Sequence, residues 1–304
     1  IFFQLGLMES AFDSATAMHH QLRGDLILIN SLSDNVQTIR PFPRSRLFQV
    51  LGANKVASVN SLYLGIGNWR NPDNKTFWLV QLYGLNPNNP AMEIPDGMYK
   101  LKQLKQLNYA LYDQAARPTL GSVTSQIQKS KKMSAQLNNI QIQISGVFTM
   151  GASFAADGNL IVSDSTFLRL FPNRRSDEID VGIISLKPGA NPKQVQANLK
   201  ARIPKDVIIL TKEEFLEREK TYWGQNRPIG VIFGFGTIVG FVVGMVIVYQ
   251  ILYSDVSDHL PEYATLKAMG YTDSYLIGVL LQEALILAIF GFIPGFIVSS
   301  GIYG

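Results

Sequence analysis

The sequence predicts a membrane protein with α-helical transmembrane spans and one large α+β domain. The 304 residues are 47% hydrophobic and only 16% charged, which is more apolar than a typical soluble protein. The apolar excess is concentrated after Pro228, where a single charged segment, 255–273, separates two long apolar runs. Residues 9–227 instead mix charged residues with short strand-type and helix-type patterns.

The region 9–227 is expected to fold as a water-soluble domain. A continuous aliphatic run predicts a mostly buried strand at 25–32. Further strands are expected at 57–66, 76–84, 140–148, 159–162, 180–186 and 207–210. A polar stretch rich in Gln, Ser and Lys, 114–136, is expected to be an exposed loop or a mobile linker.

The end of this domain carries two helix-start signals. Asn191 is a favoured N-cap and Pro192 suits the first helical position, so a helix is expected to start there and to place Val195 and Leu199 on its inner face. Its flanking strands make a split strand–helix–strand unit, half of a ferredoxin-like subdomain. A capping box from Thr211 to Glu214 then predicts a second helix, which is expected to end at "GQNRP".

The two apolar runs are predicted to be transmembrane helices. Residues 228–254 contain no charged residue and are long enough for a bilayer core of about 30 Å. The second run, 274–304, contains Glu283 and also Pro294, which is expected to interrupt the helix. The opening eight apolar residues, 1–8, are too short to span a bilayer, so we interpret them as the end of a truncated first transmembrane helix.

Between the two runs, 255–273 is predicted to hold a short capped helix. Pro261 is tolerated only in a first turn, so the helix should begin around 258–260, with Glu262 near its positive end. Gly270 should end it in a left-handed conformation, and Thr272 can cap the next helix. Three apolar side chains share one edge at three-residue spacing, namely Tyr263, Leu266 and Met269. A plain connector is the alternative, but a capped helix with an apolar edge favours docking to a partner.

Several functional classes find no support in the sequence. There is no cysteine, which excludes disulfides and thiolate metal sites. The three histidines, His19, His20 and His259, do not converge by spacing on a metal site and are expected to be exposed to solvent. The basic residues are scattered, so no nucleic-acid partner is expected. No phosphate-binding loop and no nucleophile motif occurs, so we expect neither a cofactor in this chain nor an enzyme.

The charged segment and its neighbours resemble a known family. "DHLPEYATLKAMGY", preceded by a long apolar helix and followed by "YLIGVLLQEALILAIFGFIPG", looks like the FtsX/MacB-type ABC permease domain. Within that class, "VYQILYSDVSDHLPEYATLKAMGYTD" and "SGVFTMGASFAADGNLIVSDSTFLRLF" are similar to the DevC permeases of cyanobacteria. The resemblance covers nearly the whole chain.

The resemblance implies a domain plan. The family has four transmembrane helices, with a large extracytoplasmic α+β domain, the MacB-like periplasmic core domain, between the first two. On that pattern the fourth helix is missing from this chain. The chain then divides into the end of a truncated transmembrane helix 1 (1–8), the extracytoplasmic domain (9–227), transmembrane helix 2 (228–254), a cytoplasmic coupling helix (255–273) and a truncated transmembrane helix 3 (274–304).

The resemblance also implies a mechanism. In this family the coupling helix rests on a separate ABC ATPase subunit, which binds the ATP. Closure of the ATPase dimer shifts the coupling helices and moves the extracytoplasmic domains, so no substrate crosses through the spans. The ATPase-coupling positions carried over to this sequence are Pro261, Glu262, Tyr263, Leu266, Lys267, Met269 and Gly270.

The expected setting is the inner membrane, with the chain as a multi-pass permease and its large domain in the periplasm. The expected partners are the lipid bilayer, a second copy of the chain, the ATPase, a periplasmic adaptor and, through the adaptor, an outer-membrane channel. The exported substrate would be a glycolipid or another envelope component. A lipoprotein-releasing permease and an FtsX-like regulator of a cell-wall hydrolase are the alternatives. Charge argues against this orientation, because 255–273 carries Lys267 against four acids and cytoplasmic loops favour Lys and Arg.

Two further features of the apolar runs are candidate sites. Glycines at four-residue spacing, Gly236, Gly240 and Gly244, allow close helix packing, either in a homodimer or within one chain. Glu283 is an intramembrane acid, which by default indicates a functional contact, although it can also reach the membrane surface or stay protonated.

Overall fold

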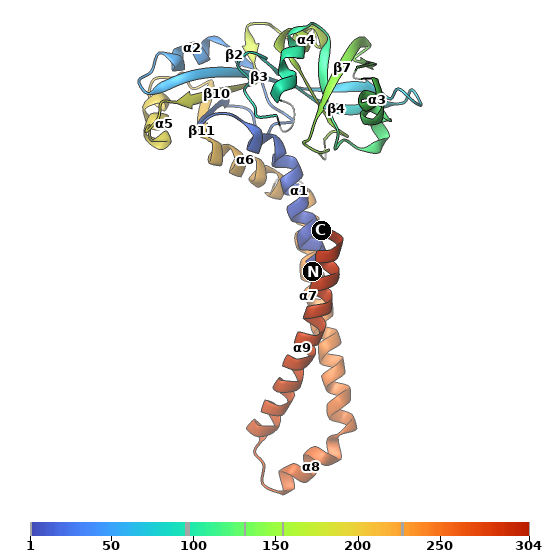
Figure 1. The fold of residues 1–304 in the computed structure, drawn as a ribbon. Coiled ribbons are helices and arrows are strands. Elements are labelled where there is room, and N and C mark those ends of the chain that lie inside the picture. The colour runs from blue at the N-terminus through green and yellow to red at the C-terminus, as the bar shows by residue number, and fades with distance from the viewer. Residues whose placement is uncertain (1, 95–97, 131, 154, 226–227, 304) are drawn as a thin grey trace. The chain divides into compact units, whose positions relative to one another are not determined.

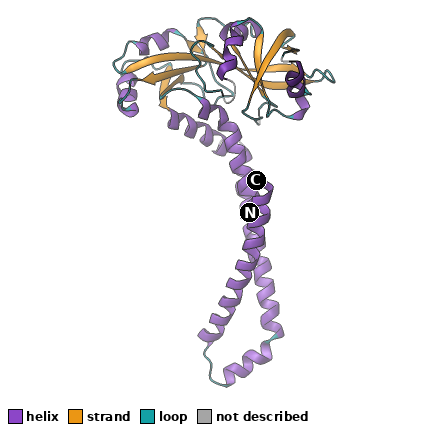
Figure 2. Ribbon diagram, in the orientation of Figure 1, coloured by secondary structure: helices purple, strands orange, loops and turns teal. Residues whose placement is uncertain are grey.

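The computed structural model describes residues 2–94, 98–130, 132–153, 155–225 and 228–303. Contacts divide the chain into two compact units: Ala11–Trp223, and Ile1–Ser10 together with Gly224–Gly304. Strands occur only in the first unit among the described residues, whereas the second is helical (Figure 2). The predicted domain ends at residue 227, and residues 226–227 lie outside the described residues.

A nine-stranded sheet forms the centre of the Ala11–Trp223 unit, in the order β11-β1-β10-β3-β4-β8-β5-β7-β6. Figure 1 labels β3, β4, β7, β10 and β11 of this sheet. Each of the seven predicted strands is present, which confirms those predictions. Strands β5, β6 and the short pair β2 and β9 were missed. The bounds are β1 Leu26–Asn30, β2 Phe42–Pro43, β3 Val56–Arg70, β4 Phe77–Leu85, β5 Tyr109–Asp113, β6 Met133–Leu137, β7 Ile140–Phe148, β8 Asn159–Ser163, β9 Glu178–Ile179, β10 Val181–Leu186 and β11 Val207–Thr211.

One half of the sheet contains the predicted split unit. Strand β1 lies between β10 and β11 and is antiparallel to both, so β10 and β11 are parallel and are connected by α5, Pro192–Lys200. Leu26 and Leu28 of β1 belong to one hydrophobic core, and Ile27 and Ile29 to another, on the two faces of the sheet. Both faces are covered, which explains why this strand is apolar throughout.

Helices supply the covering layers. The first core includes side chains of α2, Ser45–Leu51, and of α5, while the second includes side chains of α1, Phe2–Gln21, and α6, Lys212–Gln225. Asn191 caps α5 by accepting hydrogen bonds from the backbone of Lys193 and Gln194. The capping box is also present, because Thr211 and Glu214 each accept a hydrogen bond from the other's backbone N–H.

The other half of the sheet closes on itself. Besides its pairing with β7, β6 pairs with the end of β3, where Trp69 lies opposite Leu137 and Arg70 opposite Gln136. Strands β3, β4, β8, β5, β7 and β6 therefore form a closed ring around a core that includes Trp69 and Tyr112, whose ring centroids are 5.7 Å apart. Helix α4, Asp164–Leu170, packs Phe167 against this half.

The prediction of a loop at 114–136 is wrong. This stretch contains a short 3₁₀ helix, η2 Pro118–Leu120, then α3, Val123–Ser130, and the start of β6. Val123 and Ile127 lie one turn apart on α3 and are buried in the core, so two apolar positions in a polar segment are sufficient to dock the helix. A longer 3₁₀ helix, η1 Met98–Lys105, buries Leu101 and Leu104.

The second unit contains α7, Pro228–Asp258, α8, Leu260–Ala268, and α9, Asp273–Tyr303. Segments Val231–Asp258 and Asp273–Gly301 are long and apolar enough to cross a bilayer. Helix α7 continues one turn beyond the predicted end at Ser254. Pro294 lies inside α9 without ending it, contrary to the prediction, because a proline removes only one helical hydrogen bond and long apolar helices tolerate that loss.

Candidate functional site

The helix α8 is held at its start by the residues that join it to α7. His259 is its N-cap, and the His259 carbonyl accepts hydrogen bonds from the backbone of Glu262 and Tyr263. The His259 backbone N–H and its ring Nδ1 both donate to the Asp255 carbonyl, each at 3.0 Å. Pro261 occupies the first turn, where its missing N–H is not needed. Hydrogen bonds over two consecutive turns, 255–259 and 259–263, therefore tie the carboxyl end of α7 to the amino end of α8.

The end of α8 is a Schellman motif. Gly270 has φ +99°, its N–H donates to the Lys267 carbonyl, and the Tyr271 N–H donates to the Leu266 carbonyl. Lys267 Nζ then reaches Asp273 Oδ1 of α9 at 2.8 Å. Only two residues, 271 and 272, separate this cap from α9, and the Thr272 carbonyl accepts the first hydrogen bonds of that helix. A short connection of this kind can transmit a displacement of α8 to α9.

The charge on this segment is mainly negative. Asp255, Asp258 and Glu262 lie at the end of α7 and the start of α8, Asp273 begins α9, and the one lysine of the segment, Lys267, lies near the end of α8. The hydrogen bond to the Asp255 carbonyl raises the pKa of His259, and the carboxylates of Glu262 and Asp255 raise it further. The segment therefore presents the imidazole of His259, which can take up a proton, among acidic side chains. The His259 side chain is half-exposed.

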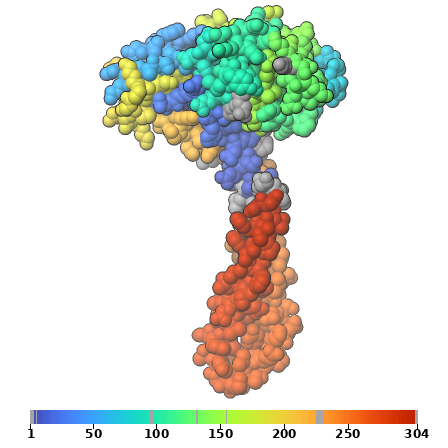
Figure 3. Space-filling view, viewed as in Figure 1, coloured from blue at the N-terminus to red at the C-terminus, as the bar shows by residue number. Residues whose placement is uncertain are grey.

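The predicted docking residues lie on an open helix. No residue of α8 is buried, and the space-filling view shows this helix uncovered (Figure 3). Met269 is 64% exposed, whereas Tyr263 and Leu266 are half-buried against their own unit. Partial burial raises the pKa of Tyr263, and the carboxylates of Asp255, Glu283 and Glu262 add to that rise. Glu283 lies in α9 and is half-buried.

Two of the three candidate packing glycines, Gly236 and Gly244, have different surroundings. At Gly236 an added side chain would collide with the amide of Gln4 in α1. The glycine therefore allows α1 and α7 of the same chain to approach closely. At Gly244 an added Cβ would find no atom within 4 Å, which leaves that part of α7 open.

A buried polar cluster in the Ala11–Trp223 unit was not predicted. His19 was expected to be exposed, but its side chain is only 1% exposed. Its ring lies tilted against that of Phe215, with the centroids 4.5 Å apart, and its Nε2 lies 3.7 Å from Glu219 Oε2. Glu219 accepts hydrogen bonds from Trp223 Nε1 and from the Val36 backbone. The spacing of Phe215, Glu219 and Trp223, one turn apart on α6, is the sequence signal that could have located this cluster.

The residues that the structure describes contain no cluster of three or more His, Asp or Glu side chains able to hold a metal ion.

The comparisons with known proteins point to one family for part of the chain. Residues 234–303 match the family described as FtsX-like permease C-terminal. These residues cover α7 from Gly234, the whole of α8 and α9 to its end. The comparison with curated proteins gave no match.

Solved structures also match. The periplasmic region of MacB from Actinobacillus actinomycetemcomitans is 14% identical with a TM-score of 0.43, and the match covers 64% of this chain and 92% of that chain. The extracellular domain of the ABC-type transporter YknZ from Gram-positive bacteria is 12% identical with a TM-score of 0.42, and the match covers 62% of this chain and 100% of that chain.

Proposed function

We propose that this chain is the permease subunit of a tripartite ABC exporter that works by mechanotransmission and exports a glycolipid or another envelope component. The observation that carries the proposal is the match of residues 234–303 to FtsX-like permeases. Over these residues two long apolar helices flank a short helix that is capped at both ends and has no buried residue. The proposed subtype is the DevC type.

In this proposal α8 is the coupling helix and contacts the ATPase subunit on the cytoplasmic side. Leu266 and Met269 form the apolar contact, with Tyr263 beside them, while Glu262 and Lys267 form its polar border. Pro261 and Gly270 set the two ends, and the hydrogen bonds of the Schellman motif keep the end of α8 from fraying. A displacement of α8 is then transmitted to α7 and α9, because few residues outside the helices separate the three of them.

The remaining parts follow from the same assignment. The Ala11–Trp223 unit would lie in the periplasm and meet an adaptor that leads to an outer-membrane channel. Gly240 and Gly244 would contact α7 of a second copy. The chain itself would be non-catalytic, with ATP bound and hydrolysed in the partner.

Topology is the first test of the proposal. The sequence has no cysteine, so single cysteines at Ser125 in α3 and at Thr265 in α8 are unique labels, and both residues are exposed. Cells with a permeabilised outer membrane are treated with a thiol reagent that cannot cross the inner membrane. Labelling at position 125 but not at 265 is expected, and the reverse pattern would refute the orientation.

Coupling is the second test. Leu266→Asp with Met269→Asp should abolish export and reduce co-purification of the ATPase subunit. The matched control is Ala264→Asp with Ala268→Asp, which adds the same charge about 150° away around the helix. Export that survives the first pair, or is lost equally with the control pair, would contradict the role of the apolar edge.

A further inference from the structure

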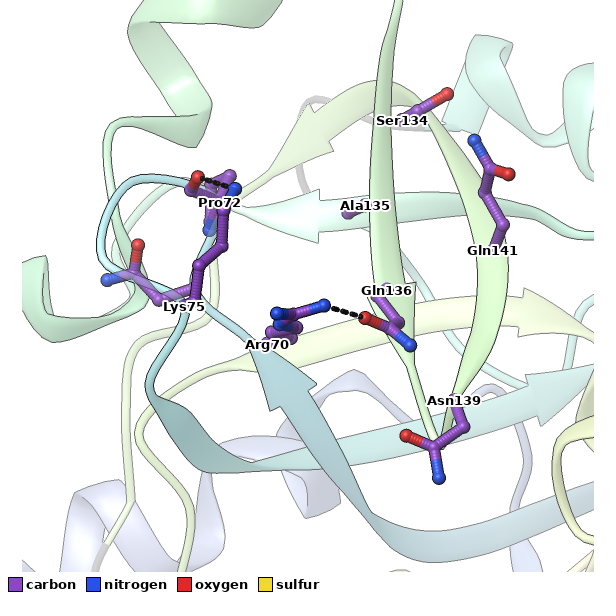
Figure 4. Close-up of a pocket in the computed structure, with 9 residues that line it drawn as sticks. Arg70, Pro72, Lys75, Ser134, Ala135, Gln136, Asn139 and Gln141 are labelled. Atoms are coloured by element: carbon purple, nitrogen blue, oxygen red, sulfur yellow. Dashed lines mark hydrogen bonds between the residues drawn. The ribbon is translucent and has the colours of Figure 1, made fainter.

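A polar pocket lies where strand β6 leaves strand β3. The two strands pair only at Gln136 and Leu137 of β6, so the preceding residues of β6 diverge from the β3–β4 hairpin. The pocket in this gap has a volume of about 410 Å³, which falls in the range of small-molecule sites. It is lined from the hairpin by Arg70 and Lys75 and from β6 and β7 by polar side chains (Figure 4).

The pocket is positively charged. Arg70 and Lys75 line it, and no lining residue described by the structure is acidic. Arg70 Nη1 donates to Gln136 Oε1 at 2.9 Å, while its Nε is buried without a partner among the described residues. The nearest acid in the hairpin, Asp73, already accepts hydrogen bonds from the backbone and hydroxyl of Ser122. The guanidinium therefore keeps donor capacity for an anion.

Both cations are held in position before any ligand binds. Arg70 is the last residue of β3 and pairs with Phe77 on one side and Gln136 on the other. Lys75 has φ +65°, a conformation that a lysine rarely adopts, and its Nζ donates to the Pro72 carbonyl at 2.5 Å. Strained backbone of this kind persists where the surrounding structure enforces it, often at binding sites.

The rest of the lining indicates what kind of anion would fit. Ser134, Gln136, Asn139 and Gln141 supply hydroxyl and amide groups, which both donate and accept hydrogen bonds. Apolar lining is limited to Pro72 and Ala135, so the pocket has no socket for a large apolar side chain or an acyl chain. Phe77, the cross-strand neighbour of Arg70, is 57% exposed and offers a flat apolar face nearby.

We propose that this pocket binds a carboxylate-bearing sugar unit of the uronic acid type. The carboxylate takes the free donors of Arg70 and Lys75, and the sugar hydroxyls bond to the amides of Gln136, Asn139 and Gln141. The pocket belongs entirely to the Ala11–Trp223 unit, so the proposal does not depend on α8 or on the orientation of the chain in a membrane.

The test uses the full chain in detergent micelles, with binding of D-glucuronate measured by titration calorimetry at about 50 mM salt, where charge attraction is only partly screened. D-glucose tests the need for the carboxylate, and acetate tests the need for the sugar. The variant is Arg70→Gln with Lys75→Gln. The matched control is Lys187→Gln with Lys205→Gln, which removes two exposed charges elsewhere on the same unit.

Saturable glucuronate binding is expected, with glucose, acetate and the Arg70/Lys75 variant each weaker by about tenfold or more, since the charged hydrogen bonds to Arg carry most of the affinity. The control pair should bind as the unmodified chain does. If the double variant does not fold, Lys75→Gln alone, whose side chain is exposed, should still weaken glucuronate by about threefold or more. Absence of saturable binding, equal binding of acetate, or equal loss in the control pair would each overturn the proposal.

Discussion

His19 should make the Ala11–Trp223 unit less stable as the pH falls below about 6.5. The imidazole is enclosed between Phe215 and Glu219 and is almost inaccessible to water. Burial, together with the smaller effect of the neighbouring His20, lowers the pKa of His19 from 6.5 to about 3. The informative perturbation is His19→Leu, which keeps an apolar side chain in the site and removes the titrating group.

The size of the effect follows from proton binding. Between pH 6.5 and about 3 the unfolded chain binds a proton at His19 that the folded unit does not, so the free energy of unfolding decreases as the pH falls. The slope is about 1.4 kcal/mol per pH unit, which amounts to about 2 kcal/mol between pH 7.5 and pH 5. Burial raises the pKa of Glu219, which acts in the opposite direction, but both proteins retain Glu219 and the comparison between them removes its contribution.

Urea unfolding followed by tryptophan fluorescence measures this directly. All three tryptophans, Trp69, Trp78 and Trp223, belong to the Ala11–Trp223 unit, so the signal reports on that unit alone. The unmodified chain should lose about 2 kcal/mol more than His19→Leu when the pH is lowered from 7.5 to 5. Parallel pH dependences in the two proteins would refute the argument, because they would mean that His19 takes up its proton equally in both states.

Three further substitutions test other parts of the structure. Arg174→Gln should destabilise the Ala11–Trp223 unit by about 3 kcal/mol in urea, because Asp180 is fully buried and Arg174 Nη2 is its charged partner at 2.6 Å; an unchanged midpoint would contradict this. Gly84→Ala should cost about 1–3 kcal/mol, because its Cβ would lie 2.6 Å from Phe167 Cβ, whereas Gly52→Ala should be nearly neutral, because its Cβ would only contact the Gln49 carbonyl oxygen at 3.9 Å. Gly270→Val places a β-branched residue at φ +99° and should speed hydrogen exchange of the Tyr271 amide about tenfold, while Gly278→Val in α9 should leave that rate unchanged.

Local signals in the sequence predicted most elements and their ends. The Asn191 cap, the capping box at Thr211 and the left-handed Gly270 depend on a few adjacent residues, and all three are present in the structure. The strands of the split unit were also predicted, because aliphatic runs bounded by turn residues are a local pattern.

The predictions that failed are those in which distant residues override local composition. The polar segment 114–136 contains α3 because the side chains of Val123 and Ile127 pack into the core of the closed half of the sheet. His19 is buried because α6 supplies Phe215 and Glu219, about 200 residues later in the chain. Strands β5 and β6 are short and mixed in composition, so their pairing with other strands defines them: β5 pairs with β7 and β8, and β6 pairs with β7 and β3.

Apolar length, caps and periodicity are properties of neighbouring residues, so the two long apolar helices, the capped helix between them and the strand-rich domain before them could all be predicted from the sequence. The return of β6 to pair with β3, which brings Arg70 and Lys75 into one pocket with Gln136 and Gln141, could not be predicted. Strand partners and their register depend on contacts between residues about 70 positions apart, and such contacts leave no trace in local periodicity.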